Sequence, residues 1–308
     1  MSKNRSRIFL VVALVVIMAI GSTSLASAGK PTPTPPPGPS PTPPPVPAGM
    51  RAGLRASNYG ISPWPAPDWW VSSISSMASR FPTSTGAMIA VVVEIDGMKG
   101  PGCWAHFPAP ISGNYPGVRF DATDLFDPDF SAFDTAGIKV WLQVESSGCE
   151  MPMLIDLVFK QYGTHPSVIG FGVDDEWYLN KQYRNGKPIT DAEAQAWVAK
   201  VQAKNANYKV FLKHWLTSQM PPTYRTGLVF IDDSQGFRSM DAMMTEFAAW
   251  GQYFYDGKVG YQYGYAADRS WWSRLNDPPK TIGNGLLSRV PNTSDLIWVD
   301  FTAHDIWP

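Results

Sequence analysis

Residues 168–178 read VIGFGVDDEWY, a stretch that combines the alternation of a β-strand with a pair of acids. Successive side chains of a strand point to opposite faces, so a strand over 168–177 has two distinct faces. One face carries the bulky groups that suit an outer surface covered by helices: Ile169, Phe171, Val173 and Asp175. The other face carries small and acidic groups that suit a crowded barrel interior: Val168, Gly170, Gly172, Asp174 and Glu176. The pattern therefore predicts two inward carboxyl groups where this strand ends.

On both sides of this strand, β-rich apolar segments alternate with helix-compatible segments, which is typical of a parallel sheet. The eight strands that we expect are 53–61, 87–96, 138–146, 168–177, 208–216, 228–234, 259–265 and 296–302. Helices are expected at 68–80, Met151–Tyr162, from a Thr190–Glu193 capping box to about 205, at 239–254 and at 280–290. Eight strands and their helices in about 258 residues predict a (β/α)8 barrel of the TIM type. An open doubly wound sheet is the alternative, because counting strands does not show closure.

The first 28 residues have the three parts of a secretory signal peptide. Lys3, Arg5 and Arg7 form a basic start, 8–20 is an apolar run, and 25–28 offers small residues for cleavage. The apolar run is short for a membrane span, which needs roughly 20 residues. We therefore predict export to the medium or the cell surface, with an uncleaved N-terminal anchor as the alternative.

Residues 29–50 form a second region, which includes the run PTPTPPPGPSPTPPPVP. Proline fixes φ and lacks a backbone donor, so this region predicts an extended polyproline spacer. A ligand for proline-binding domains is the other interpretation. From residue 51 to residue 308 the composition changes, and all 13 tryptophans lie there. We expect 51–308 to be one barrel domain.

Charge and cysteine content limit the partners and the compartment. The net charge is −1 and no long basic run occurs, so we expect no nucleic-acid partner. We also expect a monomer whose mature domain does not insert into a membrane. The two cysteines, Cys103 and Cys149, are candidates for one disulfide in an exported protein, whereas in the cytosol they would be unrelated thiols. In a barrel they would lie in adjacent loops of one rim.

The acids Asp174 and Glu176 are the candidate catalytic pair. Residues two apart in a strand lie about 6.5–7 Å from each other at Cα. Two partly desolvated carboxylates this close cannot both ionise freely, so one of them should have a raised pKa. A carboxyl group that stays protonated near neutral pH is the general acid that glycoside hydrolysis requires. The alternative is structural, with the acids capping a strand or binding a helix N-terminus.

The pattern Gly172-x-Asp174-x-Glu176 at the end of the fourth strand resembles the tail of the DxxDxDxE signature of family 18 glycoside hydrolases. Those enzymes are chitinase-like (β/α)8 barrels. The resemblance implies that Glu176 is the proton donor and that Asp174 orients a substrate N-acetyl group that acts as the nucleophile. Gly172 and Ile169 stand where the signature has its other two aspartates. Together with FLKHW at 211–215, DDSQ at 232–235 and WVDFT at 298–302, the stretch VIGFGVDDEWY is also compatible with a family of its own.

Other strand ends supply side chains that we assign to substrate binding. Tryptophan stacks on sugar rings, and Trp298 beside Asp300 is expected to form the floor of a sugar subsite on the inward face. Any one of the substrate-binding candidates could instead be a buried polar residue that is paired with another protein group. The candidates are Trp141, Gln143, Glu145, Lys213, Trp215, Asp233, Gln262, Trp298 and Asp300.

Rival chemistries are less well supported. The four histidines are scattered, and no HExxH or paired-cysteine motif occurs, which argues against zinc. We expect no resident metal and no cofactor, although an all-oxygen Mg²⁺ or Ca²⁺ site among the rim acids stays open. Lys213 would suit a Schiff-base aldolase, but an ion pair with a rim carboxylate is favoured.

The favoured function is a secreted glycoside hydrolase-like enzyme that acts on a poly- or oligosaccharide by carboxylate general acid catalysis. The alternative is a non-catalytic carbohydrate-binding or cell-wall-associated barrel. Such a barrel would keep the aromatic and amide side chains, but it would not require Asp174 and Glu176 together.

Overall fold

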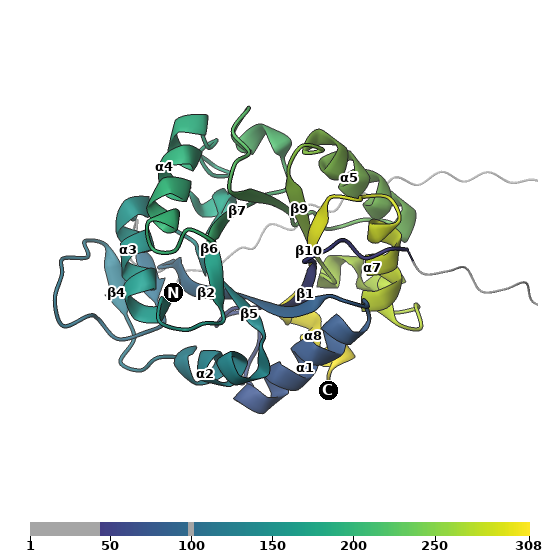
Figure 1. The fold of residues 1–308 in the computed structure, drawn as a ribbon, viewed down its shortest axis with the longest axis horizontal. Coiled ribbons are helices and arrows are strands. Elements are labelled where there is room, and N and C mark those ends of the chain that lie inside the picture. The colour runs from purple at the N-terminus through teal and green to yellow at the C-terminus, as the bar shows by residue number, and fades with distance from the viewer. Residues whose placement is uncertain (1–43, 98–101) are drawn as a thin grey trace, which may run out of the picture. The chain divides into compact units, whose positions relative to one another are not determined.

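The computed structural model describes residues 44–97 and 102–308, and at its centre eight parallel strands close into a barrel (Figure 1). β1 pairs with both β2 and β10, and this double pairing closes the cylinder. The (β/α)8 prediction is confirmed, and an open sheet is excluded. The barrel strands are β1 (Arg51–Ala56), β2 (Thr85–Ile95), β5 (Lys139–Val144), β6 (Val168–Asp174), β7 (Lys209–Lys213), β8 (Leu228–Asp232), β9 (Lys258–Tyr263) and β10 (Thr293–Trp298).

Helices surround this barrel (Figure 1), and several begin where the sequence predicts. At the start of α4 the Thr190 hydroxyl accepts a hydrogen bond from the Glu193 amide, which completes the expected capping box. The helix after 126 was not expected, because its apolar residues are few and it follows a Gly/Pro-rich loop. The helices are α1 (Pro67–Ser79), α2 (Asp127–Ala136), α3 (Met151–Tyr162), α4 (Asp191–Gln202), α5 (Met240–Tyr253), α6 (Arg269–Trp272), α7 (Pro278–Leu287) and α8 (Ala303–Ile306). Short 3-10 turns occur at Asp175–Trp177, Thr217–Gln219, Ala266–Asp268 and Asp300–Thr302.

The barrel interior is filled by a small apolar cluster that is separate from the larger core under the helices. Its members are Ile89, Trp141, Phe211, Val229, Ile231 and Ile297. Gly170 and Gly172 make room for two of these rings. A Cβ at Gly170 would lie 2.5 Å from the Trp141 ring, and a Cβ at Gly172 would lie 2.0 Å from the Phe211 ring. Both glycines therefore face inward, as the alternation predicts.

We expect Gly172→Ala to destabilise the domain by about 1–3 kcal/mol, because the added methyl overpacks a closed interior. Chemical denaturation of the two proteins measures the difference. Gly257→Ala is the control, because a Cβ at Gly257 would meet its neighbours only at ordinary contact distances of 3.5 Å or more. An unchanged unfolding midpoint for Gly172→Ala would show that Phe211 does not pack there.

Three face assignments from the sequence are wrong. Val168 packs in the outer core and Ile169 packs against the barrel interior, because the pairing of β5 with β6 skips Ile169 and so shifts the alternation by one residue. Trp298 was expected to face inward, but it packs outside the barrel against Tyr263 and Trp272. The strand β10 is buried on both faces, so its polarity does not reveal which side chains point inward.

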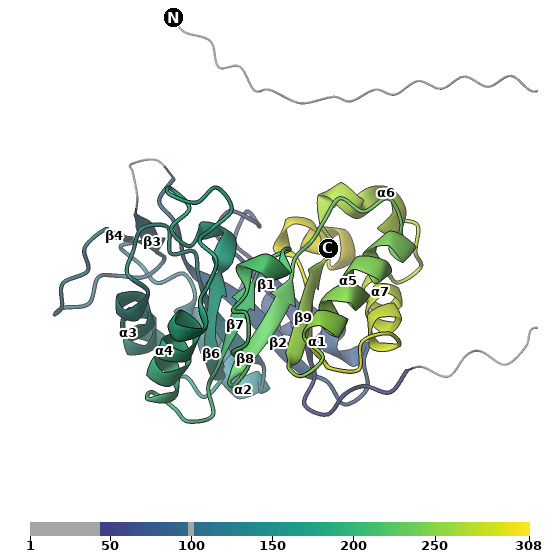
Figure 2. The same cartoon turned by 90° about the horizontal axis from the view of Figure 1, so that it is seen from above.

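The long irregular segment after β2 contains two short strands that the sequence did not indicate, β3 (Cys103–Ala105) and β4 (Val118–Phe120). β3 pairs antiparallel with the end of β2 and extends the sheet beyond the barrel. In the side view of Figure 2 both short strands lie on the same side of the molecule as α3. The structure joins Cys103 to Cys149 by a disulfide, so this extension is covalently tied to the loop after β5.

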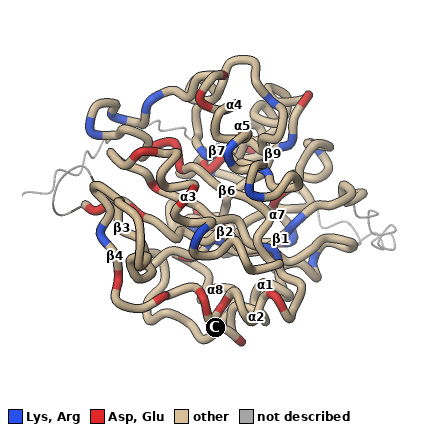
Figure 3. Tube along the Cα trace, turned by 60° about the vertical axis from the view of Figure 1, so that its left-hand side comes forward, with Lys and Arg blue, Asp and Glu red and all other residues tan. Residues whose placement is uncertain are grey.

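The predicted signal peptide, 1–28, and most of the predicted spacer, 29–43, lie outside the described residues. Among the described residues no helix is both long and apolar enough to span a membrane. Basic and acidic residues lie interspersed along the trace in Figure 3, in keeping with a net charge of −1.

Candidate active site

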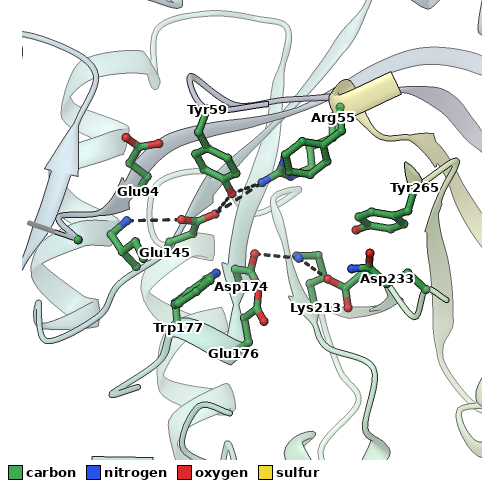
Figure 4. A pocket seen from close by; sticks show the side chains of 14 residues that line it. Arg55, Tyr59, Glu94, Glu145, Asp174, Glu176, Trp177, Lys213, Asp233 and Tyr265 are labelled. Carbon is green, nitrogen blue, oxygen red and sulfur yellow. Dashed lines mark hydrogen bonds and ion pairs between the residues drawn. The ribbon is translucent and has the colours of Figure 1, made fainter. Parts of the chain in front are cut away.

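A cavity of about 420 Å³ opens where the barrel strands end (Figure 4). Its lining comes from the C-terminal ends of strands that are far apart in the sequence, which is where (β/α)8 enzymes carry their active sites. The lining residues are Arg55, Tyr59, Glu94, Ile95, Gly97, Glu145, Asp174, Glu176, Trp177, Lys213, Asp233, Gln235, Tyr265 and Phe301.

Lys213 at the end of β7 joins two aspartates from the neighbouring strands. Its Nζ lies 2.8 Å from Asp174 Oδ2 and 2.5 Å from Asp233 Oδ2. Gln143 also donates to Asp174 Oδ2, at 3.2 Å. All of these side chains are buried, and the two carboxylates hold the pKa of Lys213 well above its usual range. Lys213 is therefore a permanent cation that pairs with acids, which agrees with the ion-pair interpretation of the sequence.

A second cation, Arg55 from β1, holds the opposite wall. Its Nη1 donates to Asp300 Oδ1 at 2.7 Å, and Asp300 also accepts from the Ser57 amide and hydroxyl. Arg55 donates to the Tyr59 hydroxyl, which in turn donates to Glu145, and Arg55 Nη2 lies 3.6 Å from Glu145 Oε1. Burial, and then the nearby charge of Asp174, raise the pKa of Glu145 to about 7. This network fixes the Glu145 carboxyl group at the cavity wall.

Glu176 lies in the 3-10 turn directly after β6, next to Asp174 (Figure 4). It is half-buried and makes no hydrogen bond or ion pair with the described residues. Burial, and then the charge of Asp174, raise the pKa of Glu176 to about 8. Burial also raises the pKa of Asp174, but the ion pair with Lys213 opposes this and favours the charged form. Glu176 thus keeps a proton at neutral pH, whereas Asp174 has a cation 2.8 Å away that favours its charged form.

The structure brings five of the residues singled out in the sequence to the cavity wall: Glu145, Asp174, Glu176, Lys213 and Asp233. Two other candidates do not line the cavity but hydrogen-bond to residues that do: Gln143 donates to Asp174, and Asp300 accepts from Arg55. These seven side chains lie within one connected region.

Four other candidates do not line the cavity. Trp141 lies deeper in the barrel interior, where its ring packs against Phe211. Gln262 is fully buried and accepts a long hydrogen bond from the Tyr265 hydroxyl. Trp215 stacks on His214, and Trp298 belongs to the outer core. The expectation that Trp298 forms the floor of a sugar subsite is therefore corrected.

Several lining residues were not predicted from the sequence, namely Arg55, Tyr59, Trp177, Tyr265 and Phe301. The segment 53–61 was read as one strand, but β1 ends at Ala56 and the chain then turns so that Tyr59 reaches Glu145. Arg55 could have been recognised from the sequence as a site residue, because an arginine inside an otherwise apolar strand requires an acidic partner. That partner, Asp300, is 245 residues away in the sequence.

A further cluster of charged side chains adjoins the cavity through Glu94. His106, directly after β3, lies between Glu94 Oε2, at 3.3 Å, and Asp121 Oδ2, at 3.0 Å. Hydrogen bonding and the two negative charges raise the pKa of His106, although its burial has the opposite effect. Among residues 44–97 and 102–308 no group of three or more His, Cys, Asp or Glu side chains is arranged to hold a metal ion.

Known proteins resemble this chain in fold but not in sequence. No family model matches the chain, and no curated protein matches it, so membership of family 18 stays a prediction. A candidate alpha-L-fucosidase from Bacteroides thetaiotaomicron has a similar structure, with a TM-score of 0.53 and 12% identity over 85% of this chain and 92% of that chain. A beta-glucuronidase from Bacteroides uniformis is similar at a TM-score of 0.47 and 12% identity, over 83% of this chain and 30% of that chain. At such low identity the likeness to the first of these proteins shows a shared fold alone.

Proposed function

We propose that the domain 51–308 is a glycoside hydrolase in which Glu176 is the general acid and Asp174 is its charged partner. The observation that carries the proposal is the contrast between these two neighbouring acids. Glu176 has a pKa of about 8, whereas Asp174 is paired with Lys213 at 2.8 Å. Environments that push the protonation of two acids apart are what acid-assisted glycosidic cleavage requires.

In this mechanism Glu176 gives its proton to the leaving oxygen as the bond between that oxygen and the sugar carbon breaks. Positive charge develops on the sugar ring, and the negative charge of Asp174 stabilises it. Water then adds to the sugar carbon, and its proton returns to Glu176. Lys213 and Gln143 keep the Asp174 carboxylate in place throughout, because both hold the same oxygen, Oδ2.

The cavity walls also suit a sugar ring. Tyr59, Trp177, Tyr265 and Phe301 present aromatic side chains around the acids. Flat apolar faces next to polar groups are the usual surroundings of bound sugars. The similar fold of a candidate alpha-L-fucosidase makes glycoside hydrolysis the first reaction class to test.

We place this reaction outside the cytoplasm. The predicted signal peptide and proline-rich spacer support export, and the Cys103–Cys149 disulfide is of the kind that persists in oxidising compartments. The substrate would then be an extracellular or cell-surface poly- or oligosaccharide, and we propose that the domain works as a monomer.

The test is turnover of a glycan panel by the purified domain, measured as released reducing ends. Products that appear with the wild type support hydrolysis. Binding of glycans without any product would identify the domain as a carbohydrate-binding module and would contradict the proposal.

The pH dependence of that turnover gives a separate prediction. Because the reaction needs protonated Glu176, kcat/KM should be high below pH 8 and fall as the pH rises through about 8. Glu145 also has a raised pKa, so the same profile is measured for Glu145→Gln, which should keep the limb near pH 8. A profile that is flat from pH 6 to pH 10 would contradict the role of Glu176.

A further inference from the structure

The charges that line the cavity are unbalanced. Two cationic side chains and five carboxyl side chains line it among the described residues: Arg55 and Lys213, with Glu94, Glu145, Asp174, Glu176 and Asp233. Both cations are already engaged. Arg55 is paired with Asp300 and Glu145, and Lys213 is paired with Asp174 and Asp233. Within the described part of the chain, the lining therefore offers no uncommitted cation to an anionic ligand.

The aspartates that Lys213 joins leave two oxygen atoms without partners. Lys213 contacts Oδ2 of both residues, and Oδ1 of Asp174 and Oδ1 of Asp233 are buried with no hydrogen-bond donor among the described residues. Asp174 is 1% exposed and Asp233 is 7% exposed, so bulk water has little access to them. A buried acceptor without a donor is unfavourable, and a ligand that supplies donors removes that penalty. Figure 4 shows both carboxyl groups beside Lys213 at the cavity.

The same arrangement carries charge as well as acceptor capacity. Two aspartates share one lysine, so the trio has a net charge of −1 when both acids are ionised. A protonated amine would donate to the two available oxygens and neutralise that charge, whereas a neutral hydroxyl group would only donate. A carboxylate or sulfate at this place would meet like charges and unpaired acceptors.

We propose that this cavity takes a sugar that bears no acid group and presents donors to Asp174 and Asp233, with a protonated amino sugar binding best and a uronic acid excluded. The proposal rests on the proposed function and names its substrate class. The expected preference, for amino sugars over uronic acids, is the opposite of that of an enzyme that acts on anionic sugars.

The test compares methyl glycosides, whose poor leaving group makes cleavage depend on the general acid, and the ligands differ at one substituent. Within each of the gluco, galacto and manno configurations, the neutral hexoside, the 2-amino-2-deoxyhexoside and the hexuronide are titrated into Glu176→Gln. That variant separates binding from turnover. In the configuration that binds, we expect the amino sugar to bind about tenfold or more tightly than the neutral sugar, and the uronide to bind at least tenfold more weakly than it. Added salt should weaken the binding of the amino sugar and leave the binding of the neutral sugar unchanged.

A variant tests the assigned residue. Asp233→Asn keeps the side-chain shape and removes one charge, so the ratio of amino-sugar to neutral-sugar affinity should fall about tenfold. Asp256→Asn, at a partly exposed ion pair with Arg225, is the matched control and should leave that ratio unchanged. Tight binding of a uronide would overturn the substrate class, and hydrolysis of a uronide by the wild type would overturn the substrate class while supporting glycoside hydrolysis. If no sugar of any class binds or is hydrolysed, both the substrate class and the proposed function are overturned.

Discussion

Replacing Glu176 with glutamine should lower kcat/KM on an unactivated glycan by about 10²–10⁴-fold, the usual contribution of a general acid. Glutamine has nearly the same shape but no acidic proton to give to the leaving oxygen. Glu176 makes no hydrogen bond with the described residues, so the melting temperature should stay close to that of the wild type. Steady-state kinetics with reducing-end detection measures the first effect, and a thermal melt measures the second.

Two comparisons sharpen that experiment. Glu246→Gln makes the same chemical change at an exposed position of α5 and should leave kcat/KM unchanged. An aryl glycoside with a good leaving group needs little protonation, so Glu176→Gln should slow it far less than it slows a glycan. Equal losses on both substrates would mean that Glu176 does not protonate the leaving group.

Replacing Lys213 with methionine should destabilise the domain by about 3–5 kcal/mol, because one partner of a buried ion network is removed while the acids remain. Asp174 and Asp233 would each lose a contact shorter than 3 Å to the only cation that the described residues place between them. Denaturant unfolding gives the change in free energy. The loss of the cation should also raise the pKa of Asp174. Because the mechanism needs Asp174 in its charged form, activity should fall as well as stability.

Lys209→Met is the matched control, since Lys209 is an exposed lysine at the other end of the same strand. Its effect should stay within about 0.5 kcal/mol. Converting both aspartates to asparagine in the Lys213→Met background should recover part of the lost stability, because no uncompensated charge is left buried. If Lys213→Met is as stable as Lys209→Met, the lysine does not hold the two acids.

The sequence predicted the barrel because its periodic features survive in the structure. Gly170 and Gly172 alternate with Phe171 and Val173, and this local pattern correctly separates the barrel interior from the helix-covered surface. It failed at Val168 and Ile169, where one extra residue in the strand reverses the alternation, and sequence periodicity cannot detect such a shift.

The site was only partly predictable, for a different reason. Acids that follow a strand within a few residues, such as Asp174 and Glu176, can be placed from local geometry alone. Arg55 and Asp300 meet across the closure of the barrel, 245 residues apart in the sequence, and the role of Tyr59 depends on β1 ending at Ala56. These contacts follow from long-range packing, which no local pattern encodes.

The protonation of Glu176 can be measured directly by following the carboxyl carbons of ¹³C-labelled glutamate by NMR as a function of pH, with Glu176→Gln identifying the signal. We expect one resonance, lost in that variant, to titrate with a pKa of about 8, beside a separate Glu145 resonance near 7. A Glu176 resonance that titrates near the ordinary glutamate value of about 4.3 would contradict its assignment as a general acid.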